Sequence, residues 1–155
     1  MTGTAHVDTF ARDRLPPRDQ WPELVFDLPE LAYPERMNCA TELLAGAIAR
    51  GQGDRVAVRS TEGLSWTYRE LEARANRIAR LLVEDMGVVP GNRVLLRGPN
   101  SPMMAASWFA IMKAGAIAVA TMPLLRAKEL TEIVTKAEAS HALCAARLAE
   151  ELELA

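Results

Sequence analysis

The sequence predicts an α/β layered domain with a mostly parallel sheet. Apolar runs of strand length alternate with segments of helical periodicity, which is typical of βαβ units. The pattern is clearest in residues 94–130, where an apolar run, a Gly-Pro-Asn-Ser turn, an apolar helix, a glycine and a second apolar run follow one another. A right-handed crossover would make these two strands parallel and place the helix over them.

Residues 1–37 are expected to form a proline-rich N-terminal arm, and residues 38–155 the α/β domain. The arm holds five of the nine prolines, namely Pro16, Pro17, Pro22, Pro29 and Pro34. Because proline fixes φ and lacks an N–H, this density excludes long helices and favours extended or turn conformations. Apolar residues between the prolines, such as Trp21 and Phe26, suggest that the arm lies over a surface.

The domain is expected to start with a helix over residues 39–50. Asn38 precedes it as a candidate N-cap, and Gly51 follows it as a candidate stop. Its apolar face would hold Leu43, Leu44 and Ile48.

A β-hairpin over residues 55–66 and a helix over residues 68–86 are expected next. Alternating residues around a Thr-Glu-Gly turn favour the hairpin, and Thr67 and Glu70 have the spacing of a capping box at the start of the helix. The apolar face of this helix would hold Leu71, Ala75, Ile78, Leu81 and Leu82. The opposite face, expected in solvent, carries Arg69, Glu72, Arg74 and Arg80.

The second half of the chain continues the strand–helix order. Strands are expected over residues 93–97, 116–121 and 141–145, and helices from Pro102, over 127–139 and over 146–155. Ser101 is the candidate N-cap before Pro102, which occupies the position that proline prefers in helices. The last helical pattern has no glycine, proline or asparagine after it, so we expect a domain truncated within a helix.

Composition excludes several classes of protein. The formal net charge of -2, without a basic cluster, argues against a nucleic-acid partner. Cys39 and Cys144 are far apart and lack a CxxC pattern, which predicts neither a zinc site nor a disulfide framework and favours a cytoplasmic setting. The apolar run 108–125 is interrupted by Lys113, Gly115 and Pro123, so a buried helix and strand are favoured over a membrane span.

The residues on their own do not predict a catalytic or metal site. Asn100 and Ser101 lie where a strand meets a helix N-terminus, which suits an anion, but a plain turn and cap is the favoured interpretation. Gly51-x-Gly53 follows a helix, unlike a dinucleotide-binding motif. Structural or solvent-facing roles are favoured for His6, His141, Ser107, Ser140 and the charged helix face of Glu150, Glu151 and Glu153.

The order of short motifs resembles the amino-terminal part of the AMP-forming adenylating enzymes, the acyl-CoA synthetase superfamily. The matching segments are Gly53-Asp-Arg-Val-Ala-Val58, Thr67-Tyr-Arg-Glu-Leu71, Gly91-Asn-Arg-Val-Leu95, Pro99-Asn100, Lys113-Ala-Gly115 and Thr121-Met-Pro-Leu-Leu-Arg-Ala-Lys-Glu-Leu130. Benzoate- and 2-aminobenzoate-CoA ligases are the most similar members, on the basis of Asn38-Cys-Ala-Thr-Glu-Leu-Leu44, Leu96-Arg-Gly-Pro-Asn100 and Met122-Pro-Leu-Leu-Arg126. The resemblance implies the N-terminal subdomain of the acyl-CoA synthetase-like fold, incomplete in this chain.

The resemblance also implies a reaction for the parent enzyme. An aromatic carboxylate attacks ATP to give an acyl-adenylate and pyrophosphate, and the thiol of CoA then displaces AMP, with Mg²⁺ on the phosphates. The chain lacks the family's Ser/Thr/Gly-rich phosphate loop, the acidic residue that holds the ribose and the C-terminal lysine that acts in adenylation. We therefore expect no catalysis by this chain alone, and no tight binding of ATP, Mg²⁺ or CoA.

One family site can be carried over to the present residues. In some relatives, a basic residue just after the proline of the segment 121–130 contacts the phosphates of CoA. That position holds Leu124 here, while Arg126 and Lys128 follow closely and become candidates for the CoA phosphates. A helix entry exposed to solvent is the favoured alternative for both.

Two other functions stay open at this point. The chain could be a non-catalytic remnant that associates with itself through an incomplete sheet, because an unfinished subdomain leaves apolar faces and a sheet edge uncovered. A small nucleotide-binding domain would require a phosphate loop, which the sequence does not contain.

Overall fold

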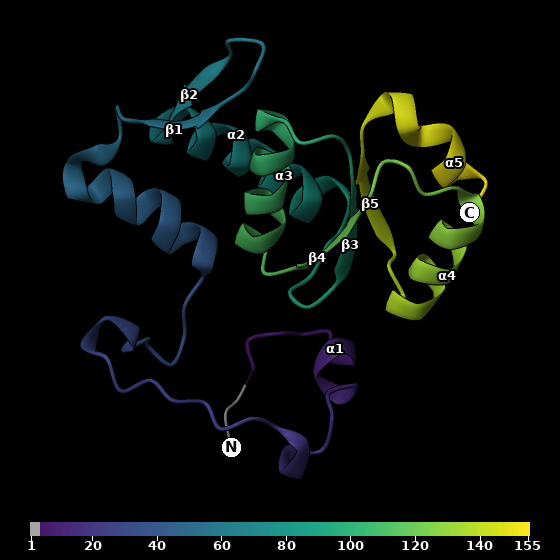
Figure 1. The fold of residues 1–155 in the computed structure, drawn as a ribbon, viewed down its shortest axis with the longest axis horizontal. Helices are drawn as coiled ribbons and strands as arrows, with labels where there is room; N and C mark the ends of the chain where they lie inside the picture. Colours follow the sequence, from purple (N-terminus) through teal and green to yellow (C-terminus); the bar gives the residue numbers. More distant parts are fainter. Residues whose placement is uncertain (1–3) are drawn as a thin grey trace.

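The computed structural model describes residues 4–155 as an α/β unit with an N-terminal arm below it (Figure 1). Its main sheet contains β3 (Arg93–Arg97), β4 (Ile117–Thr121) and β5 (His141–Cys144), in the order β4-β3-β5. Both pairings are parallel, with Arg97 opposite Thr121 on one side and Cys144 on the other. The predicted parallel βαβ architecture is confirmed.

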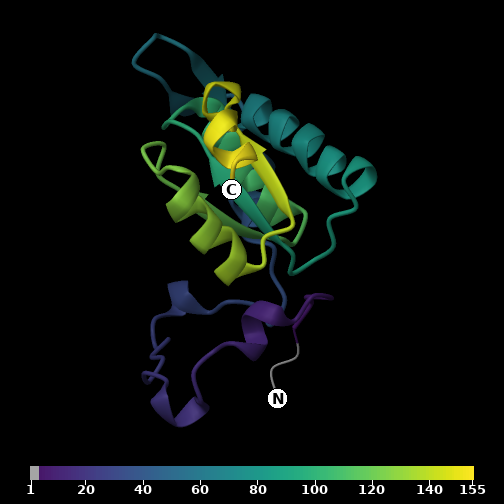
Figure 2. The same cartoon turned by 90° about the vertical axis from the view of Figure 1, so that its right-hand side faces the viewer.

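The helices of this unit cover both faces of the sheet. The helix α3 (Pro102–Lys113) joins β3 to β4 and packs beside α2 (Tyr68–Arg80), whereas α4 (Ala127–Ala137) joins β4 to β5. In Figure 2, α2 and α4 lie on opposite sides of the strands. A short final helix, α5 (Ala149–Glu153), packs against α4.

Capping side chains predicted from the sequence are present at the starts of three helices. Thr67 accepts a hydrogen bond from Glu70 N, and Thr67 N donates to the Glu70 carboxylate, which completes the predicted capping box. Ser101 accepts from Met104 N ahead of Pro102. The predicted helix after Asn38 is also present; it has wide turns at Thr41–Ala45 and Ile48–Gln52, and Asn38 Oδ1 accepts from Thr41 N.

The remaining elements also follow the sequence pattern. The hairpin consists of β1 (Val56–Arg59) and β2 (Ser65–Thr67), which pair in antiparallel fashion. Wide turns over Leu81–Asp85 extend α2, and a tight turn at Ala146–Leu148 precedes α5.

The main core lies between the sheet and the pair α2 and α3. It includes Val94, Leu96, Leu82 and Ile111, all at most 2% exposed. The prediction that Leu43 and Leu81 are buried in the core is wrong, because they are 54% and 43% exposed. The π-type turns at both positions move these side chains away from the face that ideal helical spacing gives them.

The opposite helix face also differs from the prediction. Glu72, expected in solvent, forms a half-buried ion pair with Lys113 of α3 over 3.1 Å. Arg74 stacks over the ring of Trp66, 4.2 Å from its centroid. Both contacts arise because α3 and the hairpin pack close to this edge of α2.

The N-terminal arm contacts the domain mainly through its first residues. It contains α1 (Phe10–Asp13) and short turns at Arg18–Gln20 and Pro29–Leu31, and residues 1–3 of the predicted arm lie outside the described part. Val7 N and Asp8 N both donate to Pro90 O at 2.9 Å. The expectation that the apolar residues of the proline-rich stretch lie over a surface is wrong, because Phe26 and Tyr33 pack on each other and stay 54% and 57% exposed.

Candidate functional site at the carboxyl ends of the strands

The three parallel strands end together at one edge of the sheet. There the β4–α4 loop (residues 122–126) and the turn before α5 enclose a hollow of about 260 Å³. It is lined by residues of both segments and by Arg97 of β3. Ligands of open α/β sheets bind outside the carboxyl ends of their strands, so this edge is the natural place to look for a site.

The buried guanidinium of Arg97 holds the β4–α4 loop. Arg97 is 1% exposed, and its Nη1 donates to Met122 O at 2.8 Å. Its Nη2 donates to Pro123 O at 3.2 Å and to Leu125 O at 2.7 Å. A fourth bond, from Nε to Leu148 O at 3.4 Å, reaches the turn before α5.

Arg126, a predicted candidate for CoA phosphates, lies at the start of α4 and pairs with Glu151 of α5. Its Nη1 donates to Glu151 Oε1 at 2.6 Å, while the second carboxylate oxygen accepts from Ala127 N at 2.8 Å. The Glu151 carboxylate therefore lies at the N-terminus of α4, where an external anion would bind. Lys128, the other candidate, is exposed on the first turn of α4.

Electrostatics at this edge follow from these contacts. The hydrogen bonds from Arg126 and from Ala127 N hold the pKa of Glu151 below its usual value, and Glu151 in turn raises the pKa of Arg126. Burial raises the pKa of the Cys144 thiol at the end of β5. The carboxylate and guanidinium are thus both charged near neutral pH, and the thiol is not an activated nucleophile.

The other predicted polar residues have structural contacts. Ser101 caps α3, and His141 Nε2 lies 2.9 Å from Met86 O while its Nδ1 lies 2.9 Å from Ser140 Oγ. Ser107 is buried on α3. At the end of β4, Thr121 Oγ1 is buried without a hydrogen-bond partner.

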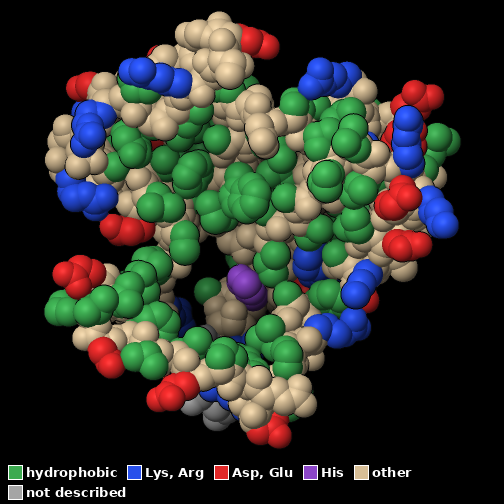
Figure 3. All heavy atoms as spheres, viewed as in Figure 1, with side chains coloured by type: hydrophobic (Ala, Val, Ile, Leu, Met, Phe, Trp, Pro, Cys, Tyr) green, Lys and Arg blue, Asp and Glu red, His purple; other side chains and the backbone are tan. Residues whose placement is uncertain are grey.

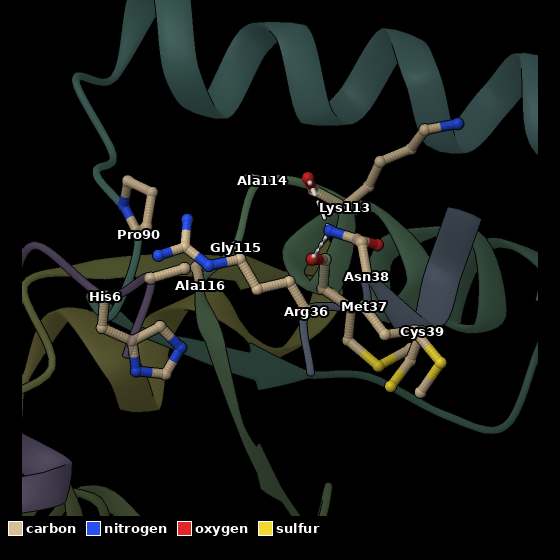
Figure 4. Close-up of a pocket in the computed structure, with 12 residues that line it drawn as sticks. His6, Arg36, Met37, Asn38, Cys39, Pro90, Lys113, Ala114, Gly115 and Ala116 are labelled. Carbon is tan, nitrogen blue, oxygen red and sulfur yellow. Dashed lines mark hydrogen bonds between the residues drawn. The ribbon is translucent and has the colours of Figure 1, made fainter. Parts of the chain in front are cut away.

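A second hollow, of about 560 Å³, opens at the amino ends of the strands (Figure 4). His6, Cys39 and Asn38 line it, and Figure 3 shows a histidine inside the gap between the arm and the domain. Asn38 Nδ2 donates to Met112 O at 2.9 Å and Lys113 O at 3.3 Å, at the C-terminus of α3. A helix C-terminus disfavours anions, although Arg36 and Lys113 also line this hollow; Lys113 is already paired with Glu72.

The comparisons with known proteins agree with the architecture. A family model described as an AMP-binding enzyme matches residues 47–155, which is more than half of the chain. The chain belongs to the AMP-binding enzyme family.

Among the relatives of this AMP-binding family member are enzymes named for aromatic acids. This chain is 44% identical over 88 residues to a salicyl-AMP ligase / salicyl-S-ArCP synthetase of Mycobacterium tuberculosis, and the match covers 53% of this chain and 15% of the relative. It is 33% identical over 105 residues to a 3-hydroxybenzoate–CoA/4-hydroxybenzoate–CoA ligase of Thauera aromatica, covering 68% of this chain and 20% of the relative.

The structure of the anthranilate CoA ligase AuaEII in complex with anthranoyl-AMP matches with a TM-score of 0.71 and 26% identity, covering 78% of this chain and 23% of that one. The AMP-binding family member thus spans less than a quarter of the length of each of these three proteins. The fold is that of acyl-CoA synthetase N-terminal domains.

At the N-terminus of α4, donors that could bind a phosphate are already hydrogen-bonded within the described residues. The Arg126 guanidinium and the first amides of α4 already bind Glu151 and Glu129. Residues 4–155 bring together no group of three His, Cys, Asp or Glu side chains that could hold a metal ion. They also contain no helix long and apolar enough to cross a membrane.

Sequence reasoning missed two residues of this edge, Arg97 and Glu151. Glu151 was expected on a charged helix face, whereas it binds the start of α4. An arginine that ends a strand with an apolar middle, directly before Gly98-Pro99, is a signal that could have pointed to Arg97. Nothing in the local pattern around Glu151 indicates its partner, which lies 25 residues earlier in the chain.

Proposed function

We propose that this chain is the N-terminal α/β portion of an aryl-CoA ligase, an enzyme that joins an aromatic carboxylate to CoA at the expense of ATP, giving acyl-CoA, AMP and pyrophosphate. The observation that carries the proposal is the similarity to the hydroxybenzoate–CoA ligase over 68% of the chain. The fold shared with the anthranilate CoA ligase supports it independently. In this proposal residues 1–37 are an arm, residues 38–155 the subdomain, and the setting is cytoplasmic.

The chain by itself is proposed to be inactive. The β4–α4 loop and the helices around it are fixed by internal contacts, and they act as scaffold for a site completed by residues outside this sequence. Aromatic substrate, ATP, Mg²⁺ and CoA accordingly belong to the parent enzyme. Arg126 stays the candidate for a CoA phosphate contact there, which requires it to exchange Glu151 for the phosphate, and Lys128 can approach without losing a partner.

Pyrophosphate release tests the proposed inactivity. The chain is incubated with ATP, Mg²⁺ and CoA, and with benzoate, 2-aminobenzoate or 3-hydroxybenzoate. We expect a rate equal to that without acid, and an acid-dependent rate would refute the inactivity of the chain.

The native product tests the proposed ligase. Its intact mass, measured from its own cell, is expected to be far above 17.0 kDa. The same pyrophosphate assay on that product is expected to show aromatic-acid dependence, and activity with none of the aromatic acids would overturn the proposed substrate class.

Self-association is the second candidate function, and the unpaired side of the edge strand β4 favours it. The strand β4 lies at one edge, and Ile117–Thr121 carries neither charge nor proline to oppose pairing with another strand. Figure 3 shows apolar side chains gathered over α3, where Trp108 is 43% and Met103 51% exposed. Light scattering at high concentration is expected to give a dimer or larger species, and a strict monomer would exclude this function.

A further inference from the structure

Four of the five side chains of the β4–α4 loop are exposed and contribute little burial to hold it in place. Met122 is 61% and Leu124 81% exposed, so neither side chain anchors the loop to the domain. Its backbone instead faces inward, where Met122 O, Pro123 O and Leu125 O all accept hydrogen bonds from Arg97. Arg97 is thus the buried anchor of the loop backbone, while Arg126 at the end of the loop is held by Glu151 and Glu129.

Two of the Arg97 bonds, to Met122 O at 2.8 Å and Leu125 O at 2.7 Å, have the short lengths of charge-assisted hydrogen bonds. Hydrogen bonds from an ionised donor to carbonyl oxygens are shorter and stronger than neutral ones, and they gain further in a low-dielectric interior. The partners of this 1% exposed cation are four main-chain carbonyls, three from the loop and one, Leu148 O, from the turn before α5. Arg97 thus links the segment that carries Arg126 with the segment that carries Glu151.

We propose that Arg97 is the positioning residue of the β4–α4 loop, and that its buried guanidinium sets the place of Arg126 at the carboxyl edge of the sheet. The relevance of this position to CoA rests on the proposed function. Arg97 lies beneath the hollow and acts through the loop, so it is not a catalytic residue. The planar guanidinium is essential, because a single lysine ammonium cannot direct donors at carbonyls of both the loop and the turn before α5.

The test compares Arg97→Gln and Arg97→Lys with Arg147→Gln, a matched control from an exposed arginine that lines the same hollow. Amide hydrogen exchange is followed by NMR in the whole chain. In both Arg97 variants we expect exchange at Leu125, Arg126 and Ala127 to accelerate about tenfold or more relative to the amides of α3. The Arg147 variant is expected to leave the loop unchanged.

Three results would overturn the proposal. Unchanged loop exchange in Arg97→Gln would show that the loop does not need Arg97. Equal acceleration in the loop and in α3 would show a purely global loss of stability, and full rescue by lysine would show that charge alone suffices.

A measurement on the unmodified chain keeps the proposal testable if the variants do not fold. The Nε proton of Arg97 is expected to exchange with solvent about tenfold or more slowly than that of Arg147. Equal exchange rates of the two Nε protons would contradict the proposal that the buried Arg97 guanidinium holds the loop.

A titration with adenosine 3′,5′-bisphosphate, which carries the 3′-phosphate of CoA and the first phosphate of its 5′-diphosphate, separates this inference from the proposed function. Although this chain alone is not expected to bind CoA tightly, at high ligand concentration we expect the Arg126 Nε–H signal to shift in the unmodified chain and not in Arg97→Gln. Absence of a shift in the unmodified chain would contradict the proposed CoA contact of Arg126, whereas the exchange data would still decide the role of Arg97.

Discussion

Arg93 and Arg97 lie four residues apart on β3 and hold α4 at its two ends. Residues i and i+4 of a strand point to the same face, here the face that α4 covers. Arg93 donates to Ala137 O at 2.8 Å and Glu138 O at 3.0 Å, where α4 ends, while Arg97 donates to the loop where α4 begins. Leu95 between them is also buried, outside the main core. Two buried cations thus fix the helix on this side of the sheet.

Replacement of Arg93 is expected to destabilise the protein strongly. Arg93 also pairs with Asp8 and stacks on the Phe10 ring, 4.4 Å from its centroid. Arg93→Gln would leave the Asp8 carboxylate without its cationic partner and the α4 carbonyls without the donors of Arg93, at a cost of about 3 kcal/mol in unfolding free energy. The control Arg80→Gln breaks an exposed ion pair with Glu84 and is expected to cost less than about 0.5 kcal/mol. Urea denaturation measures both, and equal midpoints would contradict the prediction.

Attachment of the arm is expected to weaken in acid. The backbone N–H of Phe10, then the side chains of Arg93 and Asn92, lower the pKa of Asp8 below its ordinary 3.8. Because the folded value is the lower one, the stabilisation is complete above the ordinary value and is lost as pH falls through the folded value. Asp8→Asn should therefore reduce stability near neutral pH, with a difference that shrinks below about pH 4. A variant curve parallel to the parent's down to about pH 3 would refute this.

Gly91 is expected to control the approach of the arm. Its φ is +94°, and an added Cβ would lie 2.1 Å from Asp8 O and 2.9 Å from His6 Cβ. Gly91→Ala should release this segment, seen as faster amide exchange at Val7 and Asp8. Gly87→Ala is the matched control, since its φ is +70° with nothing within 4 Å, so it carries only the backbone strain of about 1 kcal/mol. Equal exchange at Val7 and Asp8 in both variants would be evidence against the clash.

The capping box of α2 offers a prediction at a single helix end. Thr67→Ala removes the acceptor for Glu70 N and should lower the unfolding free energy by about 1 kcal/mol. Thr61, an exposed threonine in the hairpin turn, provides the control, and Thr61→Ala should change stability by less than about 0.5 kcal/mol. Thermal or urea unfolding measures the stability of both variants. Equal unfolding free energies would show that the cap has no net effect.

Much of the fold could be predicted because its signals are local. The strand β3 has the predicted bounds, and the starts of α2 and α3 follow from Thr67 and Ser101, whose side chains bond amides three residues ahead. The predictions for Leu43 and Leu81 failed because ideal helical spacing does not describe the wide turns on which they lie.

The candidate site was predicted less completely than the fold. The matched segment 121–130 led to Arg126, which lies at the start of α4 and stays a predicted contact for the phosphates of CoA. The bond to Glu151 and the clamp by Arg97 connect residues 25 to 51 positions apart, and no short-range pattern carries such information.

The sequence by itself determined the alternating elements, their caps and the family to which the chain belongs, because hydrophobic periodicity and motif order are properties of neighbouring residues. Only the tertiary structure decided what the charged residues do. Arg93 and Arg97 look alike in the sequence as the two ends of an apolar strand, yet one fixes the arm and the end of α4, and the other the loop before it. The physical reason is that a buried cation needs acceptors from several directions, and packing of distant segments alone brings those acceptors together.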